Sequence, residues 1–305
     1  MPKSISIFSP SSVSNVGPGF DILGFALNDL GDIINLSLIE EGFEIASYGA
    51  DLPIEPEKNV ATVALQSLAK AHGYNGGFKI EIEKKFKPGS GLGSSASSAA
   101  GAVFAANQLL ELGLTKEELI PFALDGEEVA SGQRHGDNIV PCMLGGFIAV
   151  KSVEPYEGFH IDTPEDLKVL VIFPDVPIKT AEARKILPQE VPLKTGIQQA
   201  ADMAGLIISL MTADYQMIKG CLADHFGTPY RKRLIPFFDE VNEMAMDAGA
   251  YGFNISGSGP AMFAFFRDED NLEDLKAKIV EQYKGADIHV RFHESGINKR
   301  GCEIL

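Results

Sequence analysis

A glycine-rich run at residues 88–97 has the composition of a phosphate-binding loop. Its glycines can adopt positive φ angles, and the small residues that follow predict a helix whose first amide N–H groups have no partner within the helix. Those amides and the helix dipole favour an anion such as a polyphosphate. The expected phosphate-binding residues are Pro88, Gly89, Ser90, Gly91, Leu92, Gly93, Ser94, Ser95, Ala96 and Ser97.

Positive charge at this loop must come from outside it. The run lacks the lysine that closes a Walker A loop, so we expect a metal ion or a side chain from elsewhere to supply the charge. Lys84, Lys85 and Lys87 could reach the loop, but they are also typical of a solvated strand end. A flexible Gly/Ser linker is the alternative for the run itself. The strand pattern before it, the alanine-rich helix pattern after it and Leu92 within it favour a binding loop.

The segment at residues 9–21 is a second candidate, because it is a long loop pattern rich in turn residues. Asn15 and Asp21 stand on either side of its Gly-Pro-Gly turn and could direct an amide and a carboxylate into one pocket. Loops of this length often bind a ligand, although an ordinary surface connection has the same composition.

A third polar cluster follows the helix predicted from a capping box at Thr115. That helix carries Glu127 near its end, and the loop expected after it brings His135, Asp137 and Asn138. Taken singly, these residues are typical of a solvated helix face or of a structural histidine. Their grouping within a dozen residues, beside glycine turns, indicates a functional site.

The length, charge and cysteine content of the chain limit the classes of function that it can have. At 305 residues the chain is long enough for two domains, and its net charge of −16 disfavours binding to nucleic acid or anionic membranes. No apolar run reaches the length of a membrane span, and the first residues show no signal-peptide pattern. Three scattered cysteines suit a reducing compartment, so we expect a cytoplasmic protein. The sequence leaves the oligomeric state open, a homodimer included.

The elements that position these residues form two halves. The first half reads as strands at 3–9, 33–39, 44–48, 78–86 and 146–151, with helices at 59–73, 96–110 and 115–131. An acidic, proline-containing segment at 152–167 predicts a boundary, so the expected domains are 1–165 and 166–305. The second half reads as strands at 168–173, 251–256, 261–266 and 287–293, with helices at 195–213, 215–226, 231–248 and 271–283 and a short helix that Thr180 caps and that carries Arg184. This alternation is typical of a ferredoxin-like layer with extra helices.

Three stretches together resemble the motifs of the GHMP family of small-molecule kinases, and they span nearly the whole chain. They are NVGPGFD (15–21), PGSGLGSS (88–95) and ISGSGP (255–260). The resemblance implies an α+β, two-domain GHMP kinase architecture, in which an ATP-binding domain like domain 2 of ribosomal protein S5 precedes a ferredoxin-like domain. The stretches HGDNIVP (135–141), TAEAR (180–184) and PYR with LIP (229–236) are similar to the members that phosphorylate homoserine. ATP, Mg²⁺ and L-homoserine are the ligands thus implied.

The resemblance also implies roles for single residues at the nucleotide. Ser95 and Glu127 would be the Mg²⁺ ligands, which suits a hard cation that prefers oxygen. The amides of the glycine loop would hold the phosphates. Many relatives carry a lysine or another cation where this chain has Ser90, so how the phosphates are neutralised beyond Mg²⁺ is left open.

Homoserine is a zwitterion with a terminal hydroxyl, so its pocket needs an acidic side, a cationic side and polar groups at the reacting oxygen. By resemblance, Asn15 and Asp21 would bind the ammonium group, and Arg184 and Arg231 the carboxylate, which a guanidinium can hold through two oxygens. The hydroxyl would be surrounded by His135, Asn138 and Thr180, with Gly257 also lining the substrate site. Asp137 would orient its loop, and the transfer would need no dedicated base.

Two other functions fit the same motifs. One is a different GHMP reaction, on an isoprenoid or sugar alcohol, or an ATP-dependent decarboxylation; the paired arginines opposite an acidic side argue against it. The other is a non-catalytic nucleotide-binding regulator, against which Ser95, Glu127 and Asn138 speak.

Overall fold

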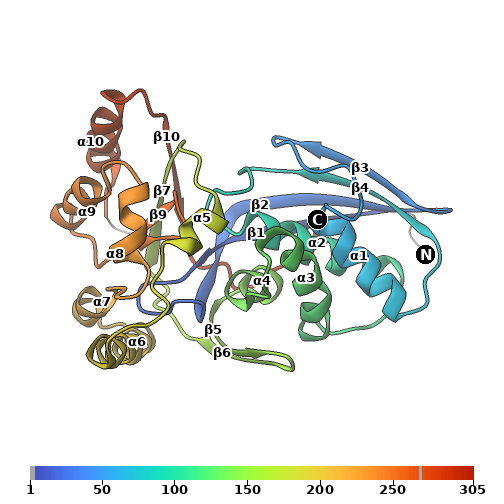
Figure 1. Cartoon of the computed structure of the whole chain (residues 1–305), viewed down its shortest axis with the longest axis horizontal. Helices are drawn as coiled ribbons and strands as arrows, with labels where there is room; N and C mark the ends of the chain where they lie inside the picture. The colour runs from blue at the N-terminus through green and yellow to red at the C-terminus, as the bar shows by residue number, and fades with distance from the viewer. Residues whose placement is uncertain (1–3, 268–269) are drawn as a thin grey trace.

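The computed structural model describes residues 4–267 and 270–305, without the side chains of Ser131, Thr180 and Ala181. Figure 1 shows an elongated molecule in which helices α1 to α4 cover one face of a large sheet and a smaller sheet stands at the other end. The larger sheet comprises β1 (Ser4–Ser14), β2 (Leu23–Ile39), β3 (Phe43–Tyr48), β4 (Gly77–Glu83), β5 (Phe147–Val153), β6 (Tyr156–Ile161) and β11 (Glu303–Ile304).

The long strand β2 organises the larger sheet, because β1, β4 and β5 all pair with it and β3 extends the sheet parallel to β4. The covering helices are α1 (Val60–Ala71), α2 (Ser94–Leu109), α3 (Lys116–Ser131) and α4 (Gly136–Leu144). Helix α2 is buried along almost its whole length, which its small residues permit. A Cβ atom at Gly101 would lie 2.8 Å from Ile34, so glycine brings this helix against β2.

The smaller sheet has the antiparallel order β10-β7-β9-β8 expected for a ferredoxin-like layer. Its strands are β7 (Leu167–Pro174), β8 (Phe253–Ile255), β9 (Met262–Arg267) and β10 (Val290–Ser295). The helices of this half are α5 (Thr180–Lys185), α6 (Leu193–Thr212), α7 (Tyr215–Cys221), α8 (Thr228–Arg231), α9 (Phe238–Asp247) and α10 (Glu273–Lys284).

An aromatic core joins the two sheets. Phe25 of β2 stacks on Phe147 of β5 with ring centroids 5.3 Å apart, and its edge meets Phe263 of β9 at 6.0 Å. All three rings are at most 1% exposed. Because residues of both sheets share this core, the segments that end near it are held in a fixed relation to one another.

The first strand is longer than its pattern predicted. We expected it to end near residue 9, but β1 keeps pairing with β2 as far as Ser14, across an irregularity between Pro10 and Ser12. A bulge tolerates the missing N–H of proline. The candidate loop therefore begins at Asn15, directly at the end of a sheet strand.

Helix α4 occupies a segment that was wrongly predicted as loop. Gly136 and Pro141 both have low helix propensity, which hid the helix in the sequence. Packing against the core outweighs that propensity, since buried apolar side chains line the helix: Ile139, Val140, Cys142 and Met143. His135 is consequently the N-cap residue of a helix.

Three predictions in the second half also need correction. The helix expected at 231–248 is interrupted, because Ile235 is extended before Pro236. The helix expected to reach residue 226 ends at Cys221, and Lys179 rather than Thr180 is the N-cap of α5.

The segment expected as the domain boundary, 152–167, contains β6, which pairs with β5. Strand β11 also returns from the end of the chain to the larger sheet. A division at residue 165 therefore stays a prediction.

Candidate active site

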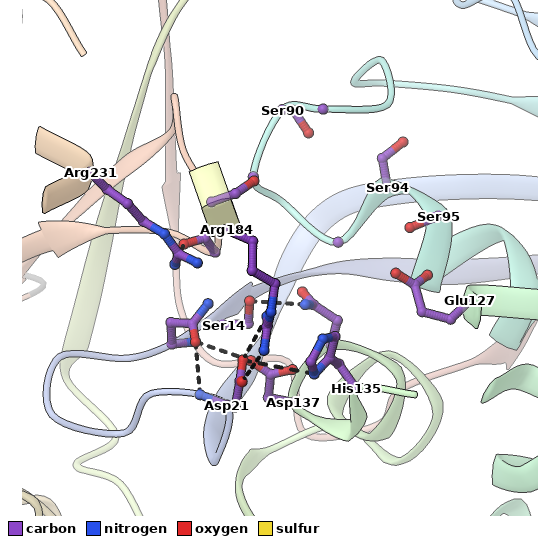
Figure 2. A pocket seen from close by; sticks show the side chains of 17 residues that line it. Ser14, Asp21, Ser90, Ser94, Ser95, Glu127, His135, Asp137, Arg184 and Arg231 are labelled. Carbon is purple, nitrogen blue, oxygen red and sulfur yellow. Dashed lines mark hydrogen bonds and ion pairs between the residues drawn. The ribbon is translucent and has the colours of Figure 1, made fainter. Parts of the chain in front are cut away.

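A cavity of about 650 Å³ lies where the three motifs meet, and most of the predicted site residues line it (Figure 2). Those residues are Asn15, Asp21, Gly89, Ser90, Gly91, Gly93, Ser94, Ser95, Glu127, His135, Asp137, Asn138, Arg184, Arg231 and Gly257. Ser14 and Ser258 also line it, although sequence reasoning did not select them; Ser258 belongs to the third motif stretch, and Ser14 directly precedes the first.

Five predicted residues do not line this cavity as described. Leu92, Ala96 and Ser97 have no exposed surface, and Ser97 donates a hydrogen bond to the Ser9 carbonyl on β1. Pro88 lines a neighbouring cavity instead. The side chain of Thr180 lies outside the described part of the structure.

The glycine loop needs its glycines because the third motif packs directly on it. A Cβ atom at Gly91 (φ 81°) would lie 2.5 Å from the carbonyl oxygen of Ser256. The Ser256 hydroxyl donates to the Gly91 carbonyl at 2.5 Å, and the Ala261 amide donates to the Ser90 carbonyl at 3.1 Å. The loop is therefore clamped between the two halves of the chain.

Helix α2 begins without a side-chain cap, because its N-cap residue is Gly93 in a left-handed conformation. Ser94 and Ser95, its first residues, face the cavity. A helix N-terminus of this kind presents amide N–H groups to an anion, and the dipole of a 16-residue helix adds to their effect.

Lys84 is neither a solvated strand end nor a ligand that reaches into the main cavity. Its side chain is 1% exposed, and its ammonium group pairs with Asp32 at 2.6 Å and also donates to the Ser94 carbonyl and the Ser98 hydroxyl. Lys85 is exposed, and Lys87 pairs with Asp175 at 2.7 Å on the surface. Lys84 therefore places a buried cation behind the first turn of α2.

Glu127 and Ser95 form the part of the cavity that could hold a metal ion. The two side chains are hydrogen-bonded, and burial raises the pKa of Glu127 to about 7, with Ser95 and Lys84 acting in the opposite direction. Their oxygen donors fit Mg²⁺. Among the described residues no group of three or more His, Cys, Asp or Glu could hold a metal, so its other ligands would be phosphate oxygens and water.

At the other end of the cavity an ion pair joins the acidic and cationic sides. Arg184 donates from both terminal nitrogens to Asp21, at 2.6 and 3.4 Å. The Asn15 side chain holds the backbone at Asp21, since the Asp21 amide donates to Asn15 Oδ1 at 2.8 Å. Figure 2 shows Arg184 crossing the cavity to reach Asp21.

Arg231 is the more deeply buried cation, at 4% exposure. It donates to the carbonyls of Gly257 at 2.9 Å and Ala183 at 3.2 Å, and its guanidinium lies 5.1 Å from the centre of the Phe20 ring. These contacts tie α5 and the third motif to the end of the cavity at Asp21.

Asp137 is a buried carboxyl group at the same end. One oxygen accepts the Asn15 amide at 3.3 Å, and the other, Oδ1, has no hydrogen-bond partner among the described residues. Burial first, and then the negative charge of Asp21, raise the pKa of Asp137 to about 7. Asp21 and Asp137 thus form an acidic end of the cavity, where a bound cation would offset their negative charge.

Two further polar groups complete this wall. The Asn138 side chain accepts from the Ser12 hydroxyl and donates to the Ser14 hydroxyl, both at 2.9 Å, so its amide orientation is fixed. Burial lowers the pKa of His135, assisted by Arg184 and Arg231 and opposed by Asp21. His135 is therefore neutral at pH 7 and can accept or donate a hydrogen bond.

A second cavity, of about 550 Å³, adjoins the glycine loop through Ser94 and Ser95. Its other lining residues, most of which sequence reasoning missed, are Leu52, Pro53, Lys58, Asn59, Val60, Lys84, Pro88, Ser98 and Ala130. The segment from 52 to 60 had shown only turn residues and a helix cap, and nothing in its pattern indicated a ligand.

Comparison with known proteins agrees with this arrangement. The N-terminal domain of GHMP kinases matches residues 59–146, and the C-terminal domain of GHMP kinases matches residues 203–285. The chain is 41% identical to the homoserine kinase of Pyrococcus abyssi, over 94% of this chain and 95% of that protein. It is 38% identical to the homoserine kinase of Chloroherpeton thalassium, over 99% and 100%.

Solved structures show the same similarity. The crystal structure of a homoserine kinase from Cytophaga hutchinsonii covers the whole of this chain, and the chain covers 98% of it, with a TM-score of 0.94 at 36% identity. The mevalonate kinase of L. major shares the fold at a TM-score of 0.70 and 18% identity, over 95% of each chain. The predicted two-domain architecture is confirmed, and the chain belongs to the GHMP kinase family.

Proposed function

We propose that this chain transfers the γ-phosphoryl group of ATP to the side-chain hydroxyl of L-homoserine, giving O-phospho-L-homoserine. The observation that carries the proposal is one cavity with a phosphate-binding helix end and a metal-binding pair at one side and paired acidic and cationic groups at the other. GHMP kinases use ATP, and the chain's relatives named homoserine kinase match it over nearly its whole length.

ATP would bind across the two cavities. Its phosphates would lie on the glycine-loop amides, and Mg²⁺, held by Ser95 and Glu127, would neutralise charge that develops during transfer. The second cavity adjoins the first turn of α2 and includes the apolar residues Leu52, Pro53 and Val60, so it suits the adenine ring. Lys84 holds the Ser94 carbonyl at the start of α2, but Asp32 balances its charge, so Mg²⁺ and the loop amides would carry most of the phosphate neutralisation.

Homoserine would replace the internal ion pair. Its ammonium group would bind to Asp21, Asn15 and Asp137 at the acidic end. Its carboxylate would bind to Arg184 and Arg231. Separating Asp21 from Arg184 without new partners would leave two half-buried charges unpaired. Only a zwitterion supplies a partner to both, which favours homoserine over sugar and isoprenoid alcohols.

The reaction depends mainly on alignment of the homoserine hydroxyl with the γ-phosphorus of ATP. The hydroxyl oxygen forms a bond to the γ-phosphorus, the bond to ADP breaks, and the hydroxyl proton passes to a phosphate oxygen. Neutral His135, the oriented amide of Asn138 and Thr180 would hold the hydroxyl in line. Asp137 would act on the ammonium group and on the Asn15 loop, and no dedicated base is required.

Replacing Asp137 with asparagine tests that assignment. Loss of a charge-assisted contact costs roughly 1.5–3 kcal/mol, so the KM for homoserine should rise about 10- to 150-fold while kcat falls less than about tenfold. Steady-state kinetics with both substrates varied would measure the two effects, with exposed Asp162→Asn as the control. A loss of about 10⁴-fold in kcat at unchanged KM, equivalent to about 5.5 kcal/mol, would make Asp137 the general base.

Arg231→Ala should affect the two substrates unequally. We expect the KM for homoserine to rise about 10- to 150-fold, because a charged hydrogen bond to the carboxylate is lost, with little change for ATP. Arg233, which is exposed nearby, gives the control Arg233→Ala. Because Arg231 also holds Gly257 and Ala183, thermal unfolding should be followed; equal effects on both KM values would mean that its role is structural.

ADP release by the purified protein with Mg-ATP tests the function as a whole. The acceptors to compare are L-homoserine, D-homoserine, mevalonate, galactose and water alone. Turnover with L-homoserine only is expected. Turnover with another alcohol would support the assignment of the phosphate site but contradict that of the zwitterion pocket. ATP binding without turnover would indicate a non-catalytic regulator.

The proposal needs only small-molecule partners and a cytoplasmic location, where ATP and reduced cysteines are available. Within residues 4–267 and 270–305, no helix combines the length and apolar character needed to cross a bilayer.

A further inference from the structure

Phe20 lies beside the guanidinium groups of both arginines of the site. The centre of its ring is 5.1 Å from the guanidinium carbon of Arg231 and 5.9 Å from that of Arg184. The ring is half-buried and stands outside the described lining of the cavity, into which both arginines project (Figure 2). Phe20 can therefore affect a ligand in the cavity only through other side chains.

The two arginines differ in what balances their charge. Arg184 pairs with Asp21. Arg231, only 4% exposed, donates to two backbone carbonyls and is ion-paired with none of the described carboxylates. Burial lowers the pKa of Arg231; Asp21 opposes this effect, and the positive charge of Arg184 adds to it. The site thus holds two guanidinium groups that repel each other, and one of them is buried.

An aromatic ring is an uncharged partner for such cations. The face of the Phe20 ring is electron-rich and attracts a guanidinium, and the attraction is larger where water is excluded, as it is at Arg231. The contact uses no N–H group of either arginine, so the donors that the backbone carbonyls leave free stay available for a carboxylate. One ring attracts both guanidinium groups, which offsets part of the repulsion between them.

The ring also packs against the turn that begins α8. A Cβ atom at Gly227 would lie 3.1 Å from a ring carbon of Phe20, so the backbone of Gly227 lies directly on the ring. Gly227 is the N-cap residue of α8, the short helix that ends at Arg231. Asp224 fixes this turn by accepting the amides of Gly227 at 2.9 Å and Thr228 at 2.6 Å. The positions of the ring and of Arg231 therefore depend on the same turn.

One buried side chain ties this turn to the loop that carries Phe20. Gln199 of α6, 4% exposed, donates to the Pro18 carbonyl at 2.8 Å and to the Asp224 carboxylate at 3.2 Å. Pro18 lies two residues before Phe20, and Asp224 three residues before Gly227. The backbone that carries the ring and the backbone that packs on it therefore share an anchor in the unliganded protein.

We propose that Phe20 is a positioning residue, whose aromatic face holds Arg184 and Arg231 in place as a joint binding site for the substrate carboxylate. Arg184 must exchange Asp21 for that carboxylate when the substrate binds. The ring lets its guanidinium group shift without losing an attractive contact, because attraction to a ring depends less on direction than a hydrogen bond does. The inference rests on the proposed function, since the carboxylate is that of L-homoserine.

Phe20→Leu removes the ring but keeps an apolar side chain against Gly227. The KM for L-homoserine should rise about tenfold, equivalent to about 1.4 kcal/mol, while kcat and the KM for ATP change less than about twofold. Phe159→Leu on β6, where phenylalanine is 60% exposed, is the control and should match the wild type. Equal KM values for homoserine in Phe20→Leu and the wild type, or equal increases for both substrates, would overturn the proposal.

Fluorination of the ring separates its charge distribution from its shape. Phenylalanine with one, three or five ring fluorines, introduced at position 20 alone, makes the ring face progressively less electron-rich at nearly constant size. The KM for L-homoserine should rise at each step, with kcat and the thermal unfolding temperature unchanged. A KM that stayed level across the series while Phe20→Leu raised it would limit Phe20 to packing and would contradict the proposal.

Turnover of the wild type separates this inference from the proposed function. If the wild type did not phosphorylate L-homoserine, the proposed function would be wrong, and this inference with it. If the wild type did so, with a KM that neither Phe20→Leu nor fluorination altered, the inference alone would be wrong and the proposed function would stand.

Discussion

Glu127→Gln is expected to lower kcat/KM for Mg-ATP by about 10³-fold or more, because a catalytic metal contributes several kcal/mol of transition-state stabilisation. Glutamine keeps the size and the hydrogen bond to Ser95 but loses the charge that holds Mg²⁺. Glu128, the neighbouring exposed acid, gives the matched control Glu128→Gln. If Glu127→Gln showed the wild-type dependence on Mg²⁺ concentration, the metal ligand would have to be another residue.

The same carboxyl group predicts the pH dependence. Its pKa is raised to about 7 by burial, so protons compete with Mg²⁺ below that pH. Mg²⁺ affinity should rise up to tenfold per pH unit below about 7, level off above it, and lose this component in Glu127→Gln. The raised pKa has the opposite effect on the unliganded fold: stability falls as pH rises from about 4.5 to about 7, so at pH 8 Glu127→Gln should be more stable than wild type without Mg²⁺.

Lys84→Met should destabilise the protein by about 3–5 kcal/mol, since it leaves Asp32 as a buried charge without its cation. Urea unfolding would measure the free energy, with adjacent exposed Lys85→Met as the control. The double variant Lys84→Met/Asp32→Leu removes both charges and should recover a large part of the loss. The KM for ATP should rise in Lys84→Met, because the Ser94 carbonyl at the start of α2 loses the charged donor that helps to hold it.

A Lys84→Met variant as stable as Lys85→Met would mean that Asp32 is neutral or solvated in the fold. Equal KM values for ATP in wild type and Lys84→Met would limit Lys84 to a structural role. The two measurements separate the stability of the larger domain from the shape of its phosphate loop.

Much of the site could be predicted because its signals are local. Glycine and serine at fixed spacing define the loop at 88–95, and the loop needs φ angles that glycine supplies. The Asn59 and Thr115 caps likewise mark real helix starts, since a side-chain cap is made within one turn. In each case the physical cause and the signal lie within a few residues of each other.

The parts that escaped prediction depend on distant residues. Lys84 is buried only because Asp32, 52 positions away, receives it in the next strand of the sheet. Helix α4 forms against the propensity of Gly136 and Pro141, through burial against the core. Arg184 faces Asp21 across 163 positions, and no periodicity in either segment indicates an ion pair. Tertiary contacts determine all three features: the burial of Lys84, the formation of α4 and the Arg184–Asp21 ion pair.

The clamp on the glycine loop bears on how the two domains can move. The Ser90 and Gly91 carbonyls accept hydrogen bonds from Ala261 and Ser256, and the Gly257 amide donates to the Ser14 carbonyl. If the two domains opened about a hinge, these hydrogen bonds would break and the glycine loop would separate from residues 256–261. We therefore expect ligands to enter while these bonds are intact, through local movement of side chains such as Arg184, which pairs with Asp21 in the unliganded protein.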